Sequence, residues 1–269
     1  MSEQEISALR LSFGRQARML REKQQLNRDD VGESCHCSGS MIGAVERGER
    51  IPDTALIHNL DKALDAKGLL SSVAEYMATE KYRAFFRDYA GLERTCHALN
   101  AYAPLLIPGL LQTEAYARAT FRAGAPAMSE EEIEREIAAR IERQELLKRD
   151  NKPYLGFIIE ESVLQRPLGG KEVLKEQLLH LLECARLHFV TLQVMPTSRE
   201  EHAGLNGYMT LVTSREHRQF VYLEYPGGSE LVSDKKRVAH YQERYGILRA
   251  QALSPSESAR FIEKLAGEL

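Results

Sequence analysis

Apolar residues recur with helical spacing along the first quarter of the chain. Two stripes flank residues 26–52, formed by Leu9, Phe13, Ala17 and Leu20 before them and by Ala55, Leu56, Leu60, Ala63 and Leu64 after them. Within residues 26–52, two shorter apolar patterns stand on either side of a tight turn. Two helices this short bury little surface by themselves, so they need the flanking helices. The pattern predicts a helix-turn-helix inside a five-helix domain of residues 1–68.

Polar residues mark where the two short helices begin and end. Asn27 is suited to cap the first helix, with Asp30 as the second half of a capping box. Ser38 is suited to cap the second helix. Gly48 stands where a helix C-terminus favours a left-handed residue, and Pro52 prevents the helix from continuing.

The helical pattern continues over residues 69–99. Its apolar face is rich in aromatic residues and consists of Val73, Met77, Tyr82, Phe85, Phe86, Tyr89 and Leu92. We favour a linker helix that packs on the following domain. A dimerisation helix is the alternative.

Residues 100–269 combine helical and strand-like patterns. Alternation and β-forming residues predict strands over residues 154–160, 190–195, 207–213 and 219–225, with residues 214–218 as the turn of a hairpin. Helical patterns begin at Pro108 and Ser129 and span residues 162–167, 171–188, 234–248 and 255–265. The order predicts a small mixed sheet of roughly four strands flanked by helices. We therefore expect a mainly α chain with a small mixed α+β domain after the linker.

Composition and charge indicate a two-domain cytoplasmic protein. The chain has 269 residues, a net charge of −3 and 43% hydrophobic residues, enough for two domains with their own cores. We find no apolar run long enough to span a bilayer and no signal peptide, so we expect no membrane partner. Four cysteines without a paired framework indicate a reducing compartment.

The cysteines are better explained by packing than by metal binding. Cys35-His36-Cys37 leaves one residue between the cysteines, whereas a zinc knuckle needs two or more to wrap the ion. We expect Cys35 and Cys37 to fill the core around the turn, and Cys96 and Cys184 to be buried in helices. No metal and no cofactor are predicted.

The run from Leu26 through Ser38, Ser40, Ile42 and Val45-Glu46-Arg47-Gly48 to Pro52 resembles the phage-repressor-like (Xre-type) DNA-binding domain. In that family the second helix of the motif enters the major groove and its first side chains meet base edges. The resemblance implies that Gly39, Ser40 and Ala44 face bases and that Arg28, Ser38 and Arg47 face phosphates. It also implies an ion pair between Arg21 and Glu46. The predicted DNA-binding positions are Arg28, Ser38, Gly39, Ser40, Gly43, Ala44, Arg47 and Arg50.

The residues of the motif also bear on how DNA would be read. Gly39, Gly43 and Ala44 are too small for bidentate base contacts, which leaves more of the recognition to Ser40 and to DNA shape. His36 stands where the turn often has Gly, although His is tolerated at positive φ. Residues 10–28 contain six basic side chains and only one acid, which favours a DNA partner. The implied partner is a double-stranded operator bound by a homodimer. A plain helical bundle or protein-interaction module is the structural alternative.

Five further motifs follow in order along the second half. They are PGLLQTEAYAR at 108–118, ARIERQ at 139–144, EESVLQRPLG at 160–169, LQVMP at 192–196 and ALSPSES at 252–258. Together they resemble an actinobacterial family of helix-turn-helix regulators with an antitoxin-like C-terminal domain of the Scr type, formerly a domain of unknown function. The resemblance implies a DNA-binding protein whose C-terminal domain binds a small protein encoded by an adjacent gene. The candidate partner- or ligand-binding residues are Pro108, Gly109, Gln112, Arg143, His202 and Tyr208.

The second half contains no complete catalytic constellation. Glu160 or Glu161 with Arg140 and Arg143 would form either a ligand-binding cluster or, as we favour, a structural ion pair between a helix and the sheet edge. We find no nucleophile–base pair, phosphate loop or metal spacing, so we do not expect an enzyme. The alternative function is an enzyme or a toxin-neutralising protein that uses the helix-turn-helix only for autoregulation.

Overall fold

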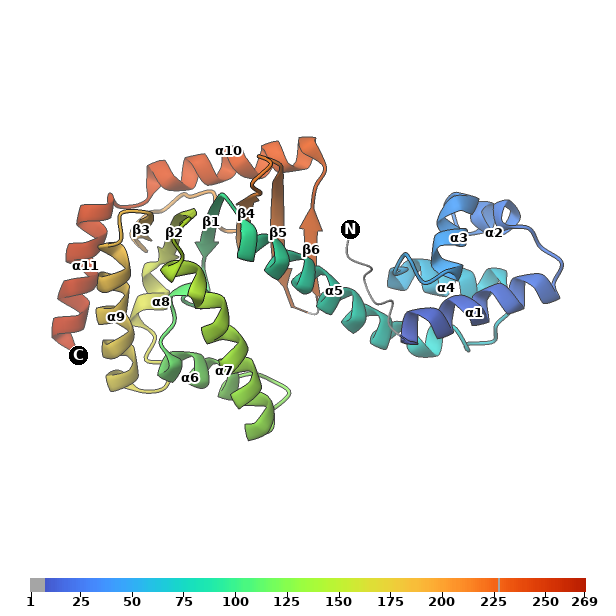
Figure 1. Ribbon diagram of the computed structural model, residues 1–269, viewed down its shortest axis with the longest axis horizontal. Coiled ribbons are helices and arrows are strands. Elements are labelled where there is room, and N and C mark those ends of the chain that lie inside the picture. The colour runs from blue at the N-terminus through green and yellow to red at the C-terminus, as the bar shows by residue number, and fades with distance from the viewer. Residues whose placement is uncertain (1–7, 227) are drawn as a thin grey trace. The chain divides into compact units, whose positions relative to one another are not determined.

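The computed structural model describes residues 8–226 and 228–269, with only the backbone described for residues 78–85 and 87. The chain forms two compact units (Figure 1). The N-terminal unit reaches Phe86 and includes Pro226–Ser229, and the C-terminal unit contains Arg87–Tyr225 and Glu230–Leu269. The fold is mainly helical, with one mixed sheet in the C-terminal unit. No described helix has the length and apolar character needed to cross a membrane.

The N-terminal unit is a small helical domain. Its elements are α1 (Ala8–Lys23), α2 (Arg28–Ser34), α3 (Gly39–Glu46), α4 (Thr54–Ala63), the short helix η1 (Ser71–Val73) and the start of α5 (Ala74–Thr95). The core joins Phe13 of α1, Val31 of α2, Ile42 of α3 and Ile57 of α4. Met77 of α5 is buried in the same core, so the fifth helix comes from beyond the predicted domain end at residue 68.

The predicted caps form at the helix-turn-helix. The Asn27 side chain accepts hydrogen bonds from the Asp29 and Asp30 backbone N–H groups, and Asp30 accepts one from Asn27 N–H. Ser38 accepts from Met41 N–H at the start of α3. The turn between α2 and α3 uses positive φ at His36 (57°), and α3 is followed by Gly48 with φ 71°. Polar side chains and two left-handed residues therefore fix the ends of these short helices.

The C-terminal unit is built on a sheet of six strands rather than the predicted four. The strands are β1 (Ala98–Ala103), β2 (Tyr154–Glu160), β3 (Val190–Met195), β4 (Met209–Thr213), β5 (Gln219–Tyr225) and β6 (Gly228–Val232), in the order β3-β2-β1-β4-β5-β6. The first three are parallel to one another, and β4 is antiparallel to β1 and β5. The prediction omitted β1 and β6. The hairpin of β4 and β5 has the predicted turn, with Thr213 opposite Gln219.

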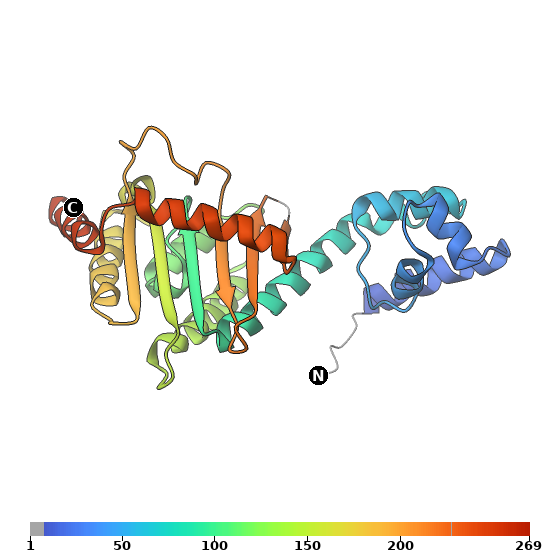
Figure 2. The same ribbon diagram turned by 90° about the horizontal axis from the view of Figure 1, so that it is seen from above.

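Helices cover both faces of this sheet. They are η2 (Gly109–Leu111), α6 (Glu114–Arg122), α7 (Glu130–Gln144), η3 (Glu145–Lys148), α8 (Glu161–Gln165), α9 (Lys171–Ala185), α10 (Lys235–Gln251) and α11 (Pro255–Glu268). Figure 2 shows α10 running across one face of the strands, with α6, α7 and α9 on the other. Val238 and Leu248 of α10 pack with Tyr102, Ile158 and Val221 of the sheet.

Candidate DNA-binding surface and polar clusters of the C-terminal unit

The exposed side of α3 carries small side chains. Ser38 and Ser40 are exposed at its start, with their hydroxyl oxygens 2.8 Å apart, and Ala44 is half-buried one turn later. Because Ser38 also caps the helix, its side chain is held at the N-terminus, where unpaired N–H groups favour an anion such as phosphate. This side of α3 matches the predicted base-facing positions Ser40 and Ala44.

Two glycines of α3 face the protein rather than solvent. A Cβ atom at Gly39 would lie 2.0 Å from Asp29 Oδ1 of α2. We had expected Gly39 to face bases, but it is a position where α3 packs closely against α2. A Cβ atom at Gly43 would lie 3.2 Å from Arg47 Nη1 and 3.5 Å from Arg28 Cδ. Gly43 therefore leaves room for these two arginines to lie across α3. From the sequence we had assigned Gly43 to the DNA-binding positions and had not predicted this packing role.

The arginines around α3 are partly engaged by acids. Arg28 Nε donates to Glu46 Oε2 at 2.8 Å, and its side chain remains 41% exposed. Arg47 donates twice to the Glu49 carboxylate, at 2.7 and 2.8 Å, at the surface. Arg50 is exposed. Arg28 and Arg47 thus lie beside Gly43 of α3, and Arg47 would have to exchange Glu49 for a phosphate to make the contact predicted for it.

Arg21 and Glu46 lie together beneath this surface, as the resemblance implied. Arg21 donates to the two Glu46 carboxylate oxygens at 2.5 and 3.2 Å, and it also donates to the Leu26 carbonyl. The Glu46 side chain is only 2% exposed. Burial alone would raise the pKa of Glu46, but the hydrogen bonds and charges of Arg21 and Arg28 outweigh it, so the pKa is lowered. The carboxylate therefore stays ionised and ties α1, α2 and α3 together.

The C-terminal unit also contains a buried acid that is paired with arginine. Glu93 of α5 is 3% exposed and accepts two hydrogen bonds from Arg143 of α7, at 2.8 and 2.9 Å. The Tyr89 hydroxyl donates to the same carboxylate at 2.8 Å. Burial and the neighbouring Glu93 raise the pKa of Tyr89, so the phenol stays protonated. The predicted partners of Arg143 were Glu160 or Glu161, and that prediction was wrong because α7 faces α5.

The PGLLQT segment is an internal turn held by hydrogen bonds. Gln112 is buried and accepts from Arg140 at 2.6 Å. Gln144 donates to the carbonyls of Gly109 and Gln112, and Gln177 of α9 donates to the Leu111 carbonyl. Pro108 is also buried. Arg140 and Gln144 of α7 and this turn therefore bind one another within the unit, and Pro108, Gln112 and Arg143 are engaged there and not presented to a partner.

His202 and Glu160 meet where the parallel strands end. The Tyr102 hydroxyl donates to Glu160 Oε1 at 2.7 Å, and His202 Nε2 lies 3.8 Å from the same oxygen. His202 Nδ1 accepts from Gly204 N–H at 3.1 Å, which orients the ring. Tyr208 stands apart from these three groups. Its hydroxyl accepts from Thr210, and burial raises its pKa to about 12.

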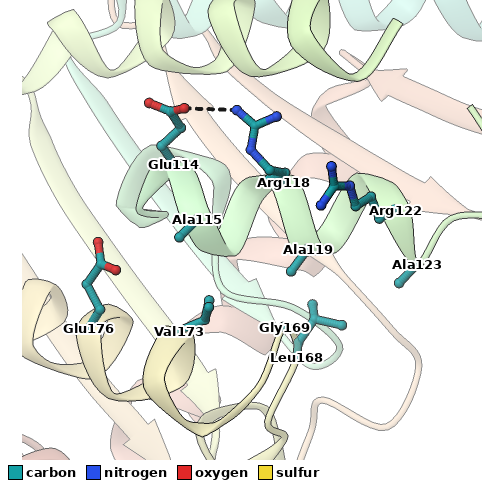
Figure 3. Close-up of a pocket in the computed structure, with 10 residues that line it drawn as sticks. All are labelled: Glu114, Ala115, Arg118, Ala119, Arg122, Ala123, Leu168, Gly169, Val173 and Glu176. Atoms are coloured by element: carbon teal, nitrogen blue, oxygen red, sulfur yellow. Dashed lines mark hydrogen bonds and ion pairs between the residues drawn. The ribbon is translucent and has the colours of Figure 1, made fainter. Parts of the chain in front are cut away.

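A cleft of about 680 Å³ opens between α6 and α9. Figure 3 shows Ala115 and Ala119 pointing from α6 toward α9 and the turn at Gly169, whereas Glu114 and Arg118 point away. Arg118 is held by Glu114 and Glu134. The wall of the cleft that faces α9 is therefore small and apolar, and the paired charges stand at its rim.

The cysteines lie in packed surroundings, as predicted, although Cys96 follows the end of α5 and is not within a helix. Cys35, Cys96 and Cys184 are buried, and Cys37 is half-buried against the N-terminal core. Burial raises the pKa of Cys35 to about 11 and that of Cys184 to about 11. Thiols with such pKa values are protonated at neutral pH and are poor nucleophiles.

Comparison with known proteins agrees with this geometry. A family model described as a helix-turn-helix domain matches residues 12–71, which contain α2 and α3, and this match supports a DNA-binding regulator. A model described as a domain of unknown function (DUF5753) matches residues 86–264. This second match covers most of the chain, and the protein belongs to that family. No curated protein and no solved structure matches the chain.

Proposed function

We propose that the protein is a sequence-specific transcription regulator that binds a double-stranded operator as a homodimer. The observation that carries this proposal is α3 itself, which has Ser40 exposed and Ala44 half-buried, and whose Gly43 is approached by the side chains of both Arg28 and Arg47. Small side chains on a recognition helix allow it to lie close to base edges, while the flanking arginines reach phosphates. A homodimer would present two such helices to a symmetric operator.

The test begins with selection of bound duplexes from a random pool, followed by footprinting of the selected sequence. In binding assays on that duplex, Arg47→Ala should weaken affinity for the selected and for random sequences alike and lower the magnitude of the salt slope by about 1. Lys62→Ala, on the exposed side of α4, is the matched control and should change neither. If no sequence is enriched, specific recognition by α3 is refuted.

The C-terminal unit, in this proposal, binds a small protein from an adjacent gene, as in antitoxin-like regulators. Support comes from exposed leucines where the parallel strands end. Leu105, which follows β1, is 67% exposed, and Leu205 of the loop after β3 is 78% exposed. Exposed apolar side chains on neighbouring loops are typical of a partner-binding surface. These leucines take the place of Pro108 and Gln112, which are buried, and of Arg143, which is engaged by Glu93, as expected contacts.

A titration of operator DNA with and without the neighbouring gene product tests this part. Binding of the partner should shift operator affinity, because coupling between two sites on one molecule is reciprocal. Leu105→Glu with Leu205→Glu should abolish the shift, whereas Leu179→Glu, an exposed leucine on α9, should leave it unchanged. If the gene product does not bind, a small-molecule site in the cleft beside α6 becomes the better proposal.

We propose that this unit acts by binding rather than by catalysis. Its titratable side chains hold one another: Glu93 is engaged by Arg143, and Glu160 by Tyr102. In this proposal these hydrogen bonds serve to stabilise the fold. The toxin-neutralising alternative predicts tight partner binding that leaves operator affinity unchanged, and the same titration distinguishes it.

A further inference from the structure

Basic residues gather at the edge of the sheet where the parallel strands begin. Four segments meet there because Ala98 is opposite both Tyr154 and Thr213, Leu155 is opposite Val190, and Thr213 is opposite Gln219. These segments are residues 94–97, 148–154, 186–189 and 214–218, and they contain seven lysines and arginines against two acids. We call Arg94, Arg149, Lys152, Arg186, Arg215 and Arg218 the basic edge.

Aromatic and imidazole rings lie among these cations. The His97 ring is 5.1 Å from the His217 ring and 5.9 Å from the Tyr154 ring, between centroids. Tyr154 is 67% exposed although it begins a central strand. The Lys152 ammonium lies 4.9 Å from the centroid of the Phe189 ring and the Arg218 guanidinium 5.6 Å from that of Phe220, and both side chains remain exposed. The basic edge is therefore supported by rings and open to a partner.

The opposite edge of the same sheet has the opposite character. Glu160 ends β2, and the loop after β3 contains Glu200, Glu201 and one cation, Arg199, together with the exposed Leu205. Figure 2 places the hairpin turn at 214–218 and the loop after β3 at opposite ends of the strands. In a chain with a net charge of −3, this separation concentrates positive charge on one edge instead of spreading it over a solvated surface.

We propose that the basic edge is a second contact for the phosphate backbone of duplex DNA, distinct from α3. This inference rests on the proposed function as a DNA-binding regulator. From β3 to β5 the edge spans about 19 Å at the usual strand spacing of about 4.8 Å. One DNA strand presents a phosphate about every 3.4 Å along the axis, so the edge faces about five or six phosphates. Lysine, arginine and tyrosine side chains are common partners of phosphate oxygens.

The contact carries no sequence information of its own. Phosphate contacts position a protein on DNA, and their number sets the salt dependence of binding. Because the basic edge and α3 belong to one chain, binding by one raises the local concentration of DNA at the other wherever both reach the same duplex. The C-terminal unit thereby contributes to operator affinity as well as to partner binding.

The experiment measures binding of the full chain to a random-sequence duplex of 40 base pairs over a range of salt concentrations. The edge variant combines Lys152→Glu, Arg215→Glu and Arg218→Glu, none of which makes a backbone contact through its side chain in the described structure. The control combines Lys171→Glu, Lys175→Glu and Arg260→Glu, which are exposed on α9 and α11 and change the net charge equally. A third variant, Ser40→Glu with Ala44→Glu, blocks the exposed side of α3.

The edge variant should bind about tenfold more weakly or worse, and the magnitude of its salt slope should fall by about 2 to 3, because about three phosphate contacts are lost. The control should match the wild type. If the edge variant binds DNA as tightly as the control does, the inference is overturned. That result is the one expected if the basic edge binds an acidic protein instead of DNA. If the edge variant fails to fold, the corresponding triple glutamine variant is measured, with the same slope decrease expected.

The α3 variant separates this inference from the proposed function. Loss of binding in the α3 variant with no effect of the edge variant leaves the regulator proposal standing and refutes the second contact. An effect of the edge variant alone supports the second contact and refutes recognition by α3. If neither variant weakens binding, both proposals fail.

Discussion

Each unit of the protein is held by one buried glutamate that arginine neutralises. In the N-terminal unit Glu46 accepts from Arg21 and Arg28, and in the C-terminal unit Glu93 accepts from Arg143. Both carboxylates are almost completely buried, with 2% and 3% of their side chains exposed. A buried charge is tolerated only when opposite charge and hydrogen bonds replace water, and both sites meet this requirement.

The two sites differ in the position and exposure of their arginine side chains. Arg28 is 41% exposed and lies across α3, so the Glu46 site joins the core to the surface proposed to bind DNA. Arg143 is 25% exposed and its partner Glu93 also binds the Tyr89 hydroxyl, so that site joins α5 to α7 within the unit. The same chemistry therefore serves a binding surface in one unit and helix packing in the other.

The largest expected effect is that of Glu46→Ala. The substitution leaves Arg21 buried without its carboxylate, which should cost the N-terminal unit about 3–5 kcal/mol of stability. Amide hydrogen exchange of peptides from α1 and α3 would measure it, because exchange reports on each unit separately. Glu49→Ala, which removes an exposed partner of Arg47, is the control and should cost less than about 1 kcal/mol. Unchanged protection in Glu46→Ala would mean that the ion pair does not stabilise the unit.

Glu93→Ala should have the next largest effect. It removes the acceptor of Tyr89 and Arg143, but Arg143 is more exposed than Arg21 and keeps more access to water. We expect a loss of about 3 kcal/mol in the C-terminal unit, the lower end of the range for buried pairs. Exchange of peptides from α7 reports it, with Glu142→Ala, exposed on the same helix, as the control. A larger loss than in Glu46→Ala would reverse the order proposed here.

The helix-turn-helix could be predicted because its signals are local. Asn27, Ser38 and Gly48 fix helix ends within a few residues, and each adopts its expected role. The strand β1 was missed because ALNAYA is rich in alanine, a weak strand former, and becomes a strand by pairing with β2 and β4 on either side. The strand β6 was also missed, and it begins at Gly228, a residue type that is uncommon in strands; Gly227 lies outside the described residues. Pairing with strands far away in the sequence decides β1, whereas β6 lies beside β5, the strand that immediately precedes it.

The candidate sites divide in the same way. Arg21 and Glu46 were paired through the resemblance to a known motif, which fixes their spacing. No local signal connects Arg143 with Glu93, fifty residues earlier, since only the packing of α7 on α5 brings them together. The sequence offered one hint: Glu93 follows Tyr89 by one helical turn and therefore lies on the aromatic face of α5. A charged residue on such a face needs a partner when it is buried. The predicted aromatic residues Tyr82 and Phe85 lie outside the described side chains.

Acid should affect the N-terminal unit through Glu46. Its folded-state pKa is lowered, so its contribution to stability is complete above the unfolded-state value near 4.5 and is lost as the pH falls through the folded-state pKa. Protection of α1 and α3 should therefore be flat from pH 7 to about 5 and fall at lower pH. Glu46→Gln should remove part of that fall, which a comparison of the two proteins by hydrogen exchange would show. An identical acid profile in the variant would assign the fall to other carboxylates.

Arg28→Ala should have the smallest effect on stability and still weaken DNA binding. Glu46 keeps both hydrogen bonds from Arg21 when Arg28 is removed, so the unit should lose about 1 kcal/mol or less. Arg28 is nevertheless one of the cations beside the exposed side of α3, and its loss should lower the magnitude of the salt slope for a duplex by about 1. Arg143→Ala should do the reverse, destabilising its unit and leaving the salt slope unchanged at a temperature where it is folded. If Arg28→Ala changes stability without changing the slope, the two buried glutamates have the same role, and the link from Glu46 to DNA binding is wrong.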